Sequence, residues 1–188
     1  MGRIVTGDNP HYQELRLAYA DPPYFGSCQR YGHHHPDGRC WNDLDTHAAL
    51  IERLAEYDGW ALSLTTNSLR IMLPLCPDDV RVMAWIKKAT IWKKYVNPCY
   101  AWEPVIVRRA RKLDGPEAGA VKMWNDWLLT PRLQAPDGFT GAKPLAFCRW
   151  LFAVMGAEAG DTLDDLFPGT GGVGRAWTEY SSQGVLAL

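Results

Sequence analysis

The sequence predicts an α/β fold in which short strands alternate with helices and form one sheet. Two observations indicate this fold. Short apolar segments, typical of buried strands, alternate with segments whose apolar residues recur at helical spacing. Two of the predicted strands end in stiff or glycine-rich turns, and ligands of open α/β sheets bind beyond such carboxyl ends. Because 188 residues lie within the range of one domain, residues 1–188 are expected to form a single unit.

The first half of the chain contains three predicted strands and two predicted helices. In order, they are a strand at 14–20, a helix at 45–57, a strand at 59–67, a short helix at 67–76 and a strand at 80–88. Asp45 or Thr46 is expected as the N-cap of the first helix, because both side chains accept hydrogen bonds from backbone N–H groups. Pro74 is expected to stop the short helix.

The second half contains two predicted strands, two helices and an insert. They are a strand within 100–111, an irregular insert at 112–142, a helix at 143–157, a strand at 161–167 and a final helix that begins at about residue 172. The insert is rich in Gly, Pro and Trp and has no clean period. Pro144 is expected in the first turn of the penultimate helix and Gly156 near its end.

The composition excludes several classes of protein. The formal net charge of −1 implies no electrostatic partner for the molecule as a whole. We find no signal peptide, and no apolar run approaches the roughly 18 residues that span a bilayer, so no membrane partner is expected. The five cysteines are irregularly spaced, which favours reduced thiols and a cytoplasmic location.

Residues 169–174 form a glycine-rich turn between a predicted strand and a predicted helix. Its pattern resembles a dinucleotide fingerprint, but that fold needs a further strand and an acid about 20 residues later, and 14 residues follow Gly174. A phosphate-binding loop needs Lys-Ser or Lys-Thr after the last glycine, where this chain has Arg175-Ala176. A tight turn without a ligand remains an alternative.

A rigid corner, Asp21-Pro22-Pro23-Tyr24, follows the first predicted strand. The prolines fix the backbone, so the Asp21 carboxylate is held in place. This carboxylate and the Pro22 carbonyl can accept hydrogen bonds from an NH₂ group, and the Tyr24 ring offers a face for stacking. The set suits an exocyclic amine on a planar base, although an ordinary turn capped by Asp21 is the alternative.

These motifs together resemble the S-adenosylmethionine-dependent amino-methyltransferases of DNA. In that family Asp-Pro-Pro-Tyr is the catalytic motif of adenine-N6 enzymes, and a turn matching Asp165, Phe167, Gly169 and Gly171 holds the cofactor. Members in which the catalytic motif comes first form a permuted class, and this chain has that order. Further matches are Lys143-Pro144 at the head of a helix, the segment 101–107, and the position of the insert 112–142, where the family has its target-recognition region.

The resemblance implies a Rossmann-like methyltransferase sheet with helices on both faces, permuted and shortened at the C-terminus. It implies that the N6 amine of a flipped adenine donates hydrogen bonds to Asp21 and to the Pro22 carbonyl while Tyr24, assisted by Phe25, stacks on the base. It also implies that Lys143, Pro144, Asp165, Phe167, Gly169 and Gly171 bind S-adenosylmethionine. No metal is implied. Since the family continues through two more strands, a homodimer or a partner chain that completes the sheet is an open alternative.

Residues 80–112 are strongly basic, with nine Lys and Arg and the single acid Glu103. Such a segment, interleaved with aromatic residues, is typical of nucleic-acid binding, whereas a solvated face over a few core aromatics is the alternative. The residues predicted to contact DNA are Phe25, Lys87, Lys88, Lys93, Lys94, Arg108 and Arg109.

Cysteines and histidines gather in residues 28–43. Cys28, Cys40 and the histidines at 33–35 could bind zinc, but their spacing matches no common zinc finger, so a loop on the substrate side is preferred. The family resemblance implies that the protein is a DNA adenine-N6 methyltransferase. The alternatives are a cytosine-N4 or RNA methyltransferase and a non-catalytic nucleic-acid-binding protein on the same scaffold.

Overall fold

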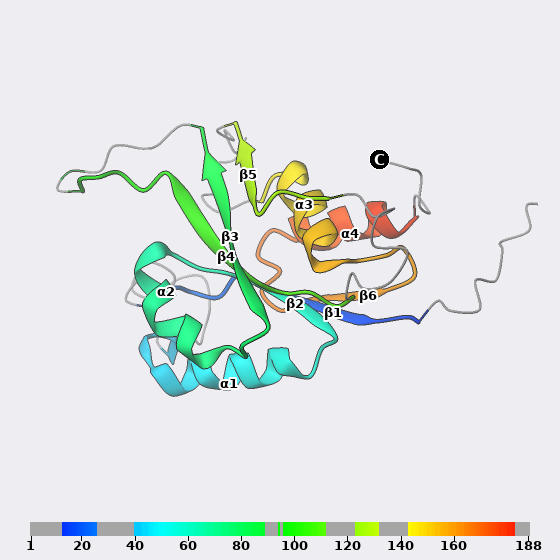
Figure 1. Cartoon of the computed structure of the whole chain (residues 1–188), viewed down its shortest axis with the longest axis horizontal. Helices are drawn as coiled ribbons and strands as arrows, with labels where there is room; N and C mark the ends of the chain where they lie inside the picture. The colour runs from blue at the N-terminus through cyan, green and yellow to red at the C-terminus, as the bar shows by residue number, and fades with distance from the viewer. Residues whose placement is uncertain are drawn as a thin grey trace, which may run out of the picture.

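A computed structural model of the chain describes residues 13–25, 40–88, 94, 96–111, 123–131 and 143–182. These residues form one six-stranded sheet with helices on both faces, which confirms the predicted fold class (Figure 1). Among the described helices, none combines the length and apolar character that crossing a membrane requires.

The sheet has the strand order β5-β3-β4-β2-β1-β6. The strands are β1 (Arg16–Ala20), β2 (Gly59–Ser63), β3 (Val80–Lys87), β4 (Trp102–Arg108), β5 (Trp127–Thr130) and β6 (Thr162–Asp165). β1 pairs in parallel with both β2 and β6, and β3 pairs in parallel with β5, whereas β4 is antiparallel to β2 and β3. The carboxyl ends of β1, β2, β3, β5 and β6 therefore lie at one edge of the sheet, which we call the active edge. β4 begins at this edge.

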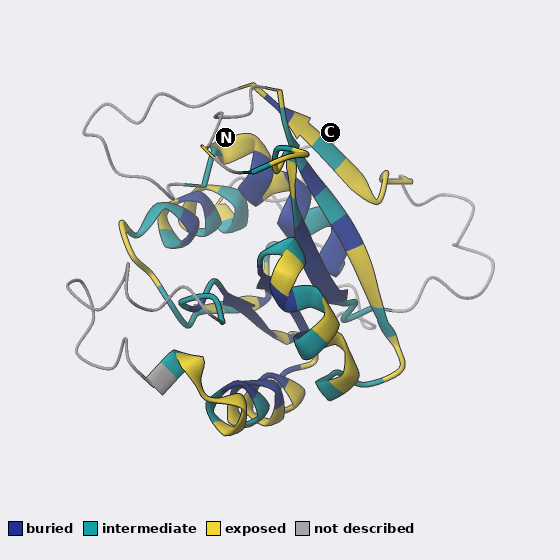
Figure 2. Cartoon of the chain, turned by 90° about the vertical axis from the view of Figure 1, so that its left-hand side faces the viewer, coloured by how far each residue is buried: buried dark blue, intermediate teal, exposed yellow. Residues whose placement is uncertain are grey.

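Two helices cover each face of the sheet (Figure 1). They are α1 (Leu44–Ala55) and α2 (Thr66–Met72) on one face, and α3 (Leu145–Met155) and α4 (Gly172–Ser182) on the other. Two short 3₁₀ turns, Cys40–Asn42 and Leu73–Leu75, flank α1 and α2. Strand side chains alternate between the faces, so Leu17 and Tyr19 pack under α3 while Ala18 and Ala20 pack under α1. Figure 2 shows this buried centre against exposed outer helix faces.

The predicted helices and the five predicted strands are confirmed, with corrections at their ends. The N-cap of α1 is Asp43 rather than Asp45 or Thr46, and Thr46 donates a hydrogen bond to the Asp43 side chain. Pro144 is the N-cap of α3 rather than a residue of its first turn. Gly156 ends α3 with a φ of 76°, as expected of a C-cap glycine. α2 ends before Pro74, which lies in the following 3₁₀ turn.

The prediction that the insert 112–142 is irregular throughout is wrong at β5. This strand has four residues and lies at the outer side of β3. Two of its side chains face solvent, so its sequence lacks the alternation of apolar and polar residues that would have predicted a strand. Its Thr130 hydroxyl accepts a hydrogen bond from the Trp85 indole at 2.8 Å. The insert thus contributes to the packing beneath the active edge.

A buried ionic cluster fixes the start of β6. The Asp161 carboxylate accepts two hydrogen bonds from Arg111, at 2.6 and 2.7 Å, and others from the backbone N–H groups of Leu15 and Glu158. Burial alone would raise the pKa of Asp161, but these hydrogen bonds outweigh it, so the pKa lies below its ordinary value. Because Leu15 immediately precedes β1, the cluster aligns β6 with β1.

Candidate active site

The first and last strands of the sheet lie side by side and bring the two predicted motifs together. Tyr19 of β1 is opposite Asp165 of β6, and the Leu166 N–H donates to the Tyr19 carbonyl at 2.9 Å. The corner that starts at Asp21 and the turn that starts at Phe167 therefore leave the sheet at adjacent positions of the active edge.

The Asp21 carboxylate is held from two sides. Its Oδ1 accepts a hydrogen bond from the Tyr24 hydroxyl at 2.9 Å, and its Oδ2 lies 2.6 Å from the Lys143 Nζ. The Lys143 side chain is only 6% exposed, whereas that of Asp21 is 23% exposed. Burial, followed by the charge of Asp21, raises the pKa of Tyr24 well above its usual value, so Tyr24 is a hydrogen-bond donor here. Asp21 therefore faces solvent from a fixed position.

Asp165, at the end of β6, differs from Asp21 because its carboxylate is buried and has no described partner. Among the described residues neither of its buried carboxylate oxygens has a hydrogen-bond partner. Burial raises the pKa of Asp165 and the charge of Asp21 adds to this effect, while the nearby Phe167 N–H and Lys143 ammonium oppose it without restoring the usual value. The Phe167 N–H is close enough to act on this pKa but does not form a hydrogen bond of normal geometry. A buried carboxylate without a donor fits a ligand that brings one.

The glycine turn after β6 needs its glycines. Gly169 and Gly171 have φ values of 47° and 70°, in the left-handed region that favours glycine. A Cβ on Gly171 would also lie 3.1 Å from the Arg175 guanidinium, which donates to the Thr170 carbonyl. α4 begins at Gly172, directly after the turn, and the Cβ position of Gly172 lies 3.9 Å from the Lys143 carbonyl. The Lys143-Pro144 backbone therefore lies against the turn.

The buried ring of Trp85 lies close to the ammonium groups of two lysines. The Lys143 Nζ lies 5.5 Å from the centroid of this buried ring, and the Lys87 Nζ lies 4.4 Å from it. Lys87 also pairs with Glu103 of β4. Trp85 is one of the aromatic residues of the basic segment 80–112, and its alternation with Met83 on β3 indicates that its side chain is buried.

An aromatic cluster joins the two motifs on the α1 face. Trp41 packs edge-on against Phe167 at 5.1 Å and against His47 at 5.3 Å, and Phe25 lies 5.9 Å from His47. Burial lowers the pKa of His47, whose Nε2 lies 2.9 Å from the Trp41 carbonyl. Trp41 and His47 were not predicted as site residues from the sequence. The helical spacing of His47 with Leu50, Ile51 and Leu54 could have placed it on the buried side of α1.

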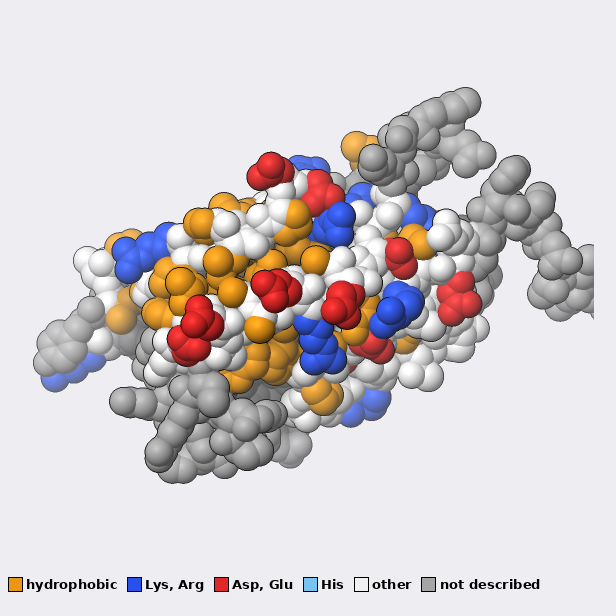
Figure 3. Space-filling view, turned by 90° about the horizontal axis from the view of Figure 1, so that it is seen from below, with side chains coloured by type: hydrophobic (Ala, Val, Ile, Leu, Met, Phe, Trp, Pro, Cys, Tyr) orange, Lys and Arg blue, Asp and Glu red, His pale blue; other side chains and the backbone are white. Residues whose placement is uncertain are grey.

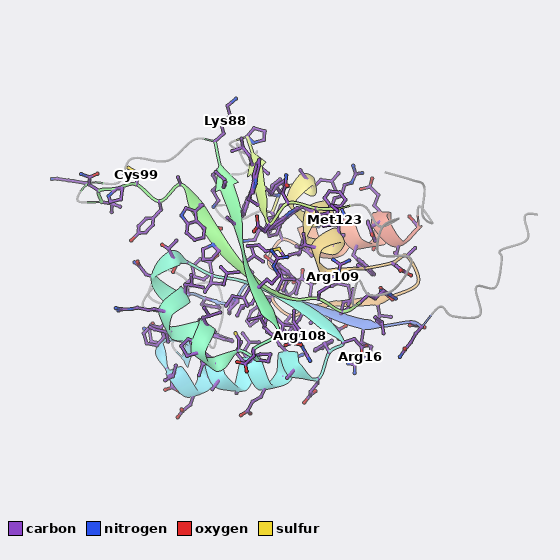
Figure 4. The ribbon with its side chains drawn as sticks, in the orientation of Figure 1. Arg16, Lys88, Cys99, Arg108, Arg109 and Met123 are labelled. Atoms are coloured by element: carbon purple, nitrogen blue, oxygen red, sulfur yellow. The ribbon has the colours of Figure 1, made fainter. Side chains whose placement is uncertain are left out.

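The structure brings only some of the predicted DNA contacts to the active edge. Lys87 ends β3 at this edge and Lys88 follows it directly, whereas Arg108 lies at the opposite end of β4 and pairs with Asp79 (Figure 4). Arg109 donates to the carbonyls of Ala153 and Val154 at the end of α3. Arg108 and Arg109 are therefore engaged away from the candidate site.

Other features of the active edge suit a flat or extended ligand. Tyr100 and Trp102 are 49% and 38% exposed there, and a groove of about 490 Å³ is lined by Thr66 and residues 96–102. Lys94 is exposed as well. Seen from the α1 side, by contrast, acidic and basic side chains are interspersed among hydrophobic ones, without a field of one sign (Figure 3).

Some predicted features lie outside the described residues, among them Lys93, Cys28 and the histidines at 33–35. Within the part of the chain that the structure describes, no group of three metal-ligating side chains occurs, and Cys76, Cys99 and Cys148 are free thiols.

Comparison with solved structures identifies the architecture. The crystal structure of M1.HpyAVI matches 89% of this chain and 77% of that chain, with a TM-score of 0.50 and 14% sequence identity. The crystal structure of an M1.HpyAVI–SAM complex matches 89% of this chain and 78% of that chain, with a TM-score of 0.56 and 12% identity. The chain has a Rossmann-like methyltransferase fold. No protein-family model and no curated protein matches the sequence.

Proposed function

We propose that the protein transfers a methyl group from S-adenosylmethionine to the N6 amine of adenine in DNA. One observation carries this proposal: a solvent-facing carboxylate in a rigid Asp-Pro-Pro-Tyr corner stands beside a buried carboxylate that has no described partner. The first suits an acceptor amine, and the second suits a positively charged donor molecule. The M1.HpyAVI–SAM complex, which shares the fold, supports the choice of methyl donor.

Asp165 and the glycine turn fit S-adenosylmethionine. The Asp165 carboxylate can accept hydrogen bonds from the ammonium group of the methionine moiety, which would supply its missing donor. Gly169 and Gly171, in the left-handed backbone conformation, place no side chain between the turn and a bound ligand, and Phe167 adds an apolar wall. When bound, S-adenosylmethionine would supply a methyl group on a positively charged sulfur. The sulfur would leave with the electron pair of its C–S bond as neutral S-adenosylhomocysteine, and the methylated nitrogen would release one proton to solvent.

The corner is suited to hold an exocyclic amine. Adenine N6 is a weak nucleophile because its lone pair is delocalised into the ring. Hydrogen bonds from this amine to Asp21 and to the Pro22 carbonyl favour a pyramidal nitrogen with a localised lone pair. Fixing the amine in this orientation supplies much of the catalysis, because productive alignment replaces a bimolecular encounter. Tyr24, whose hydroxyl braces Asp21, presents its ring beside the same carboxylate.

The active edge is suited to DNA from which the target base is flipped. We assign phosphate contacts to Lys87 and Lys88, and base stacking to Tyr100 and Trp102, because β3 ends and β4 begins at this edge while Arg108 and Arg109 lie elsewhere. We add Lys94 to the phosphate contacts because it is exposed in the segment between β3 and β4. We assign target recognition to the insert 112–142, which enters the sheet at β5. The catalytic corner precedes the cofactor turn, so the proposed enzyme belongs to the permuted class.

Methyl transfer from labelled cofactor to mixed DNA, followed by nucleoside analysis, tests the proposal. Label on N6-methyladenine is expected, and label on cytosine or only on RNA would change the acceptor. Asp21→Ala is expected to abolish transfer with little change in cofactor affinity. The matched control is Asp164→Asn, because Asp164 is exposed and accepts a hydrogen bond from Tyr57. Tight DNA binding without any transfer would refute the enzyme and favour the non-catalytic alternative.

A further inference from the structure

We propose that Lys143 is a positioning residue for Asp21: its ammonium holds the carboxylate that receives the acceptor amine. This inference rests on the proposed function and changes the role of one residue. The family resemblance implied that Lys143 binds the cofactor, because a Lys-Pro pair stands at the head of a helix. The contacts of the side chain point instead to the catalytic corner.

The ammonium of Lys143 is held in a closed environment. It lies 2.6 Å from Asp21 Oδ2, 5.5 Å from the Trp85 ring and 5.9 Å from the Phe147 ring. A charge on a side chain that is only 6% exposed needs a paired carboxylate, because its lost hydration is otherwise not replaced. Both rings belong to the buried core, and aromatic faces attract a cation. The position of Nζ is therefore set by the fold.

The backbone of Lys143 is fixed as well. Pro144 is the N-cap of α3, and the next turn of this helix places Phe147 and Cys148 in the core. The Lys143 carbonyl packs against the start of α4 at Gly172. With both ends of the residue held, the Asp21–Lys143 pair behaves as part of the scaffold rather than as a mobile surface ion pair.

The two carboxylates of the site, Asp21 and Asp165, differ in their partners. Lys143 is paired with Asp21, while Asp165 is left without a described partner. A lysine side chain that is only 6% exposed offers little of its surface to a cofactor while it contacts Asp21. Asp165 remains able to receive a cationic group, and Lys143 compensates the charge of the other carboxylate.

The arrangement orients Asp21 and still leaves it able to bind an amine. Tyr24 occupies one oxygen and Lys143 the other, so the carboxylate cannot rotate without breaking a contact. Each carboxylate oxygen accepts more than one hydrogen bond, and Asp21 is 23% exposed, so an incoming amine still finds a lone pair. A preoriented acceptor of this kind lowers the reorganisation that transfer requires.

The test separates turnover from cofactor binding. Lys143→Met keeps most of the length of the side chain and removes the charge, and we expect kcat to fall about 100-fold, as for small misplacements of a reacting group. The Kd of S-adenosylmethionine, measured by calorimetry without DNA, is expected to stay near the wild-type value. Lys143→Arg is expected to restore part of kcat. The control Arg149→Met removes an exposed charge from the same helix and should change neither quantity.

Three outcomes would contradict the inference. A large rise in Kd with kcat unchanged at saturating cofactor would make Lys143 a cofactor-binding residue. No change in either quantity would leave it without a role. If Lys143→Met does not fold, Lys143→Gln is compared in its place, with the same split expected. If the wild-type protein transfers no methyl group to any nucleic acid, the proposed function fails and the positioning role fails with it.

Discussion

Replacing Asp165 with asparagine exchanges a buried charge without a described partner for a neutral side chain of the same shape. Both Asp165 oxygens are buried and unbonded among the described residues, and such a group costs about 1–3 kcal/mol. Asparagine keeps polar atoms in the same place, so we expect the variant to gain about 1 kcal/mol, at the low end of that range. For a chain of this size this corresponds to a rise in Tm of about 2–4 °C.

The stability gained by Asp165→Asn should decrease as the pH falls. Burial raises the pKa of Asp165, so the folded protein binds this proton more tightly than the unfolded chain. The contribution of Asp165 to stability is therefore greatest below the pKa of the unfolded chain and is lost as the pH rises through the folded pKa. Asp165→Asn should be more stable than the wild type at neutral pH, and the difference should shrink as the solution is acidified.

Unfolding by urea without cofactor, over a series of pH values, measures this difference. Saturating cofactor at 100 times its Kd should then stabilise the wild type by about 2.7 kcal/mol and leave Asp165→Asn unaffected. Asp164→Asn, at the neighbouring exposed position, should show neither effect. A variant less stable than the wild type at neutral pH would mean that Asp165 has a partner already, which would refute the reasoning.

Three further predictions follow from other contacts. Asp161→Asn breaks a buried pair with Arg111 and should lower the free energy of unfolding by about 3–5 kcal/mol at neutral pH. Because the pKa of Asp161 is lowered in the folded protein, its contribution to stability is present above the pKa of the unfolded chain and is lost as the pH falls through the folded pKa. The urea unfolding curves of variant and wild type should therefore converge in acid. Gly171→Ala forces a side chain into a φ of 70° and should cost about 1–2 kcal/mol in unfolding measurements, together with weaker cofactor binding. Trp102→Ala should weaken the binding of single-stranded DNA by about 1–3 kcal/mol in a fluorescence titration while Tm stays unchanged, and an unaltered affinity would remove Trp102 from the interface.

The sequence predicted the local elements well because their signals are local. Apolar runs marked β1, β2 and β4, and Gly156 marked the end of α3. β5 could not be predicted, because a four-residue segment with two exposed side chains becomes a strand only through its pairing with β3. The antiparallel direction of β4 likewise depends on its neighbours and not on its own residues.

Charge counting predicted the basic segment but could not distinguish the roles of its members. Arg109 and Lys88 are both basic residues of one segment, yet Arg109 donates to a carbonyl at the end of α3 while Lys88 directly follows β3 at the active edge. The same limit applies to Lys143, whose pairing with Asp21 joins distant parts of the chain. Sequence spacing indicated that Lys143 belonged to the site, and only the packing around Trp85 indicates which carboxylate it contacts.

The stability of β6 explains how the fold tolerates Asp165. This strand has four residues, and a carboxylate lies at each end. Asp161, just before the strand, is satisfied by Arg111 and two backbone N–H groups, while Asp165 at its carboxyl end has no described donor. The favourable cluster at one end offsets the unfavourable charge at the other and keeps β6 in register with β1. Because that register sets Asp165 beside the corner of Asp21, loosening Asp161 should impair methyl transfer even though it lies at the opposite end of the strand.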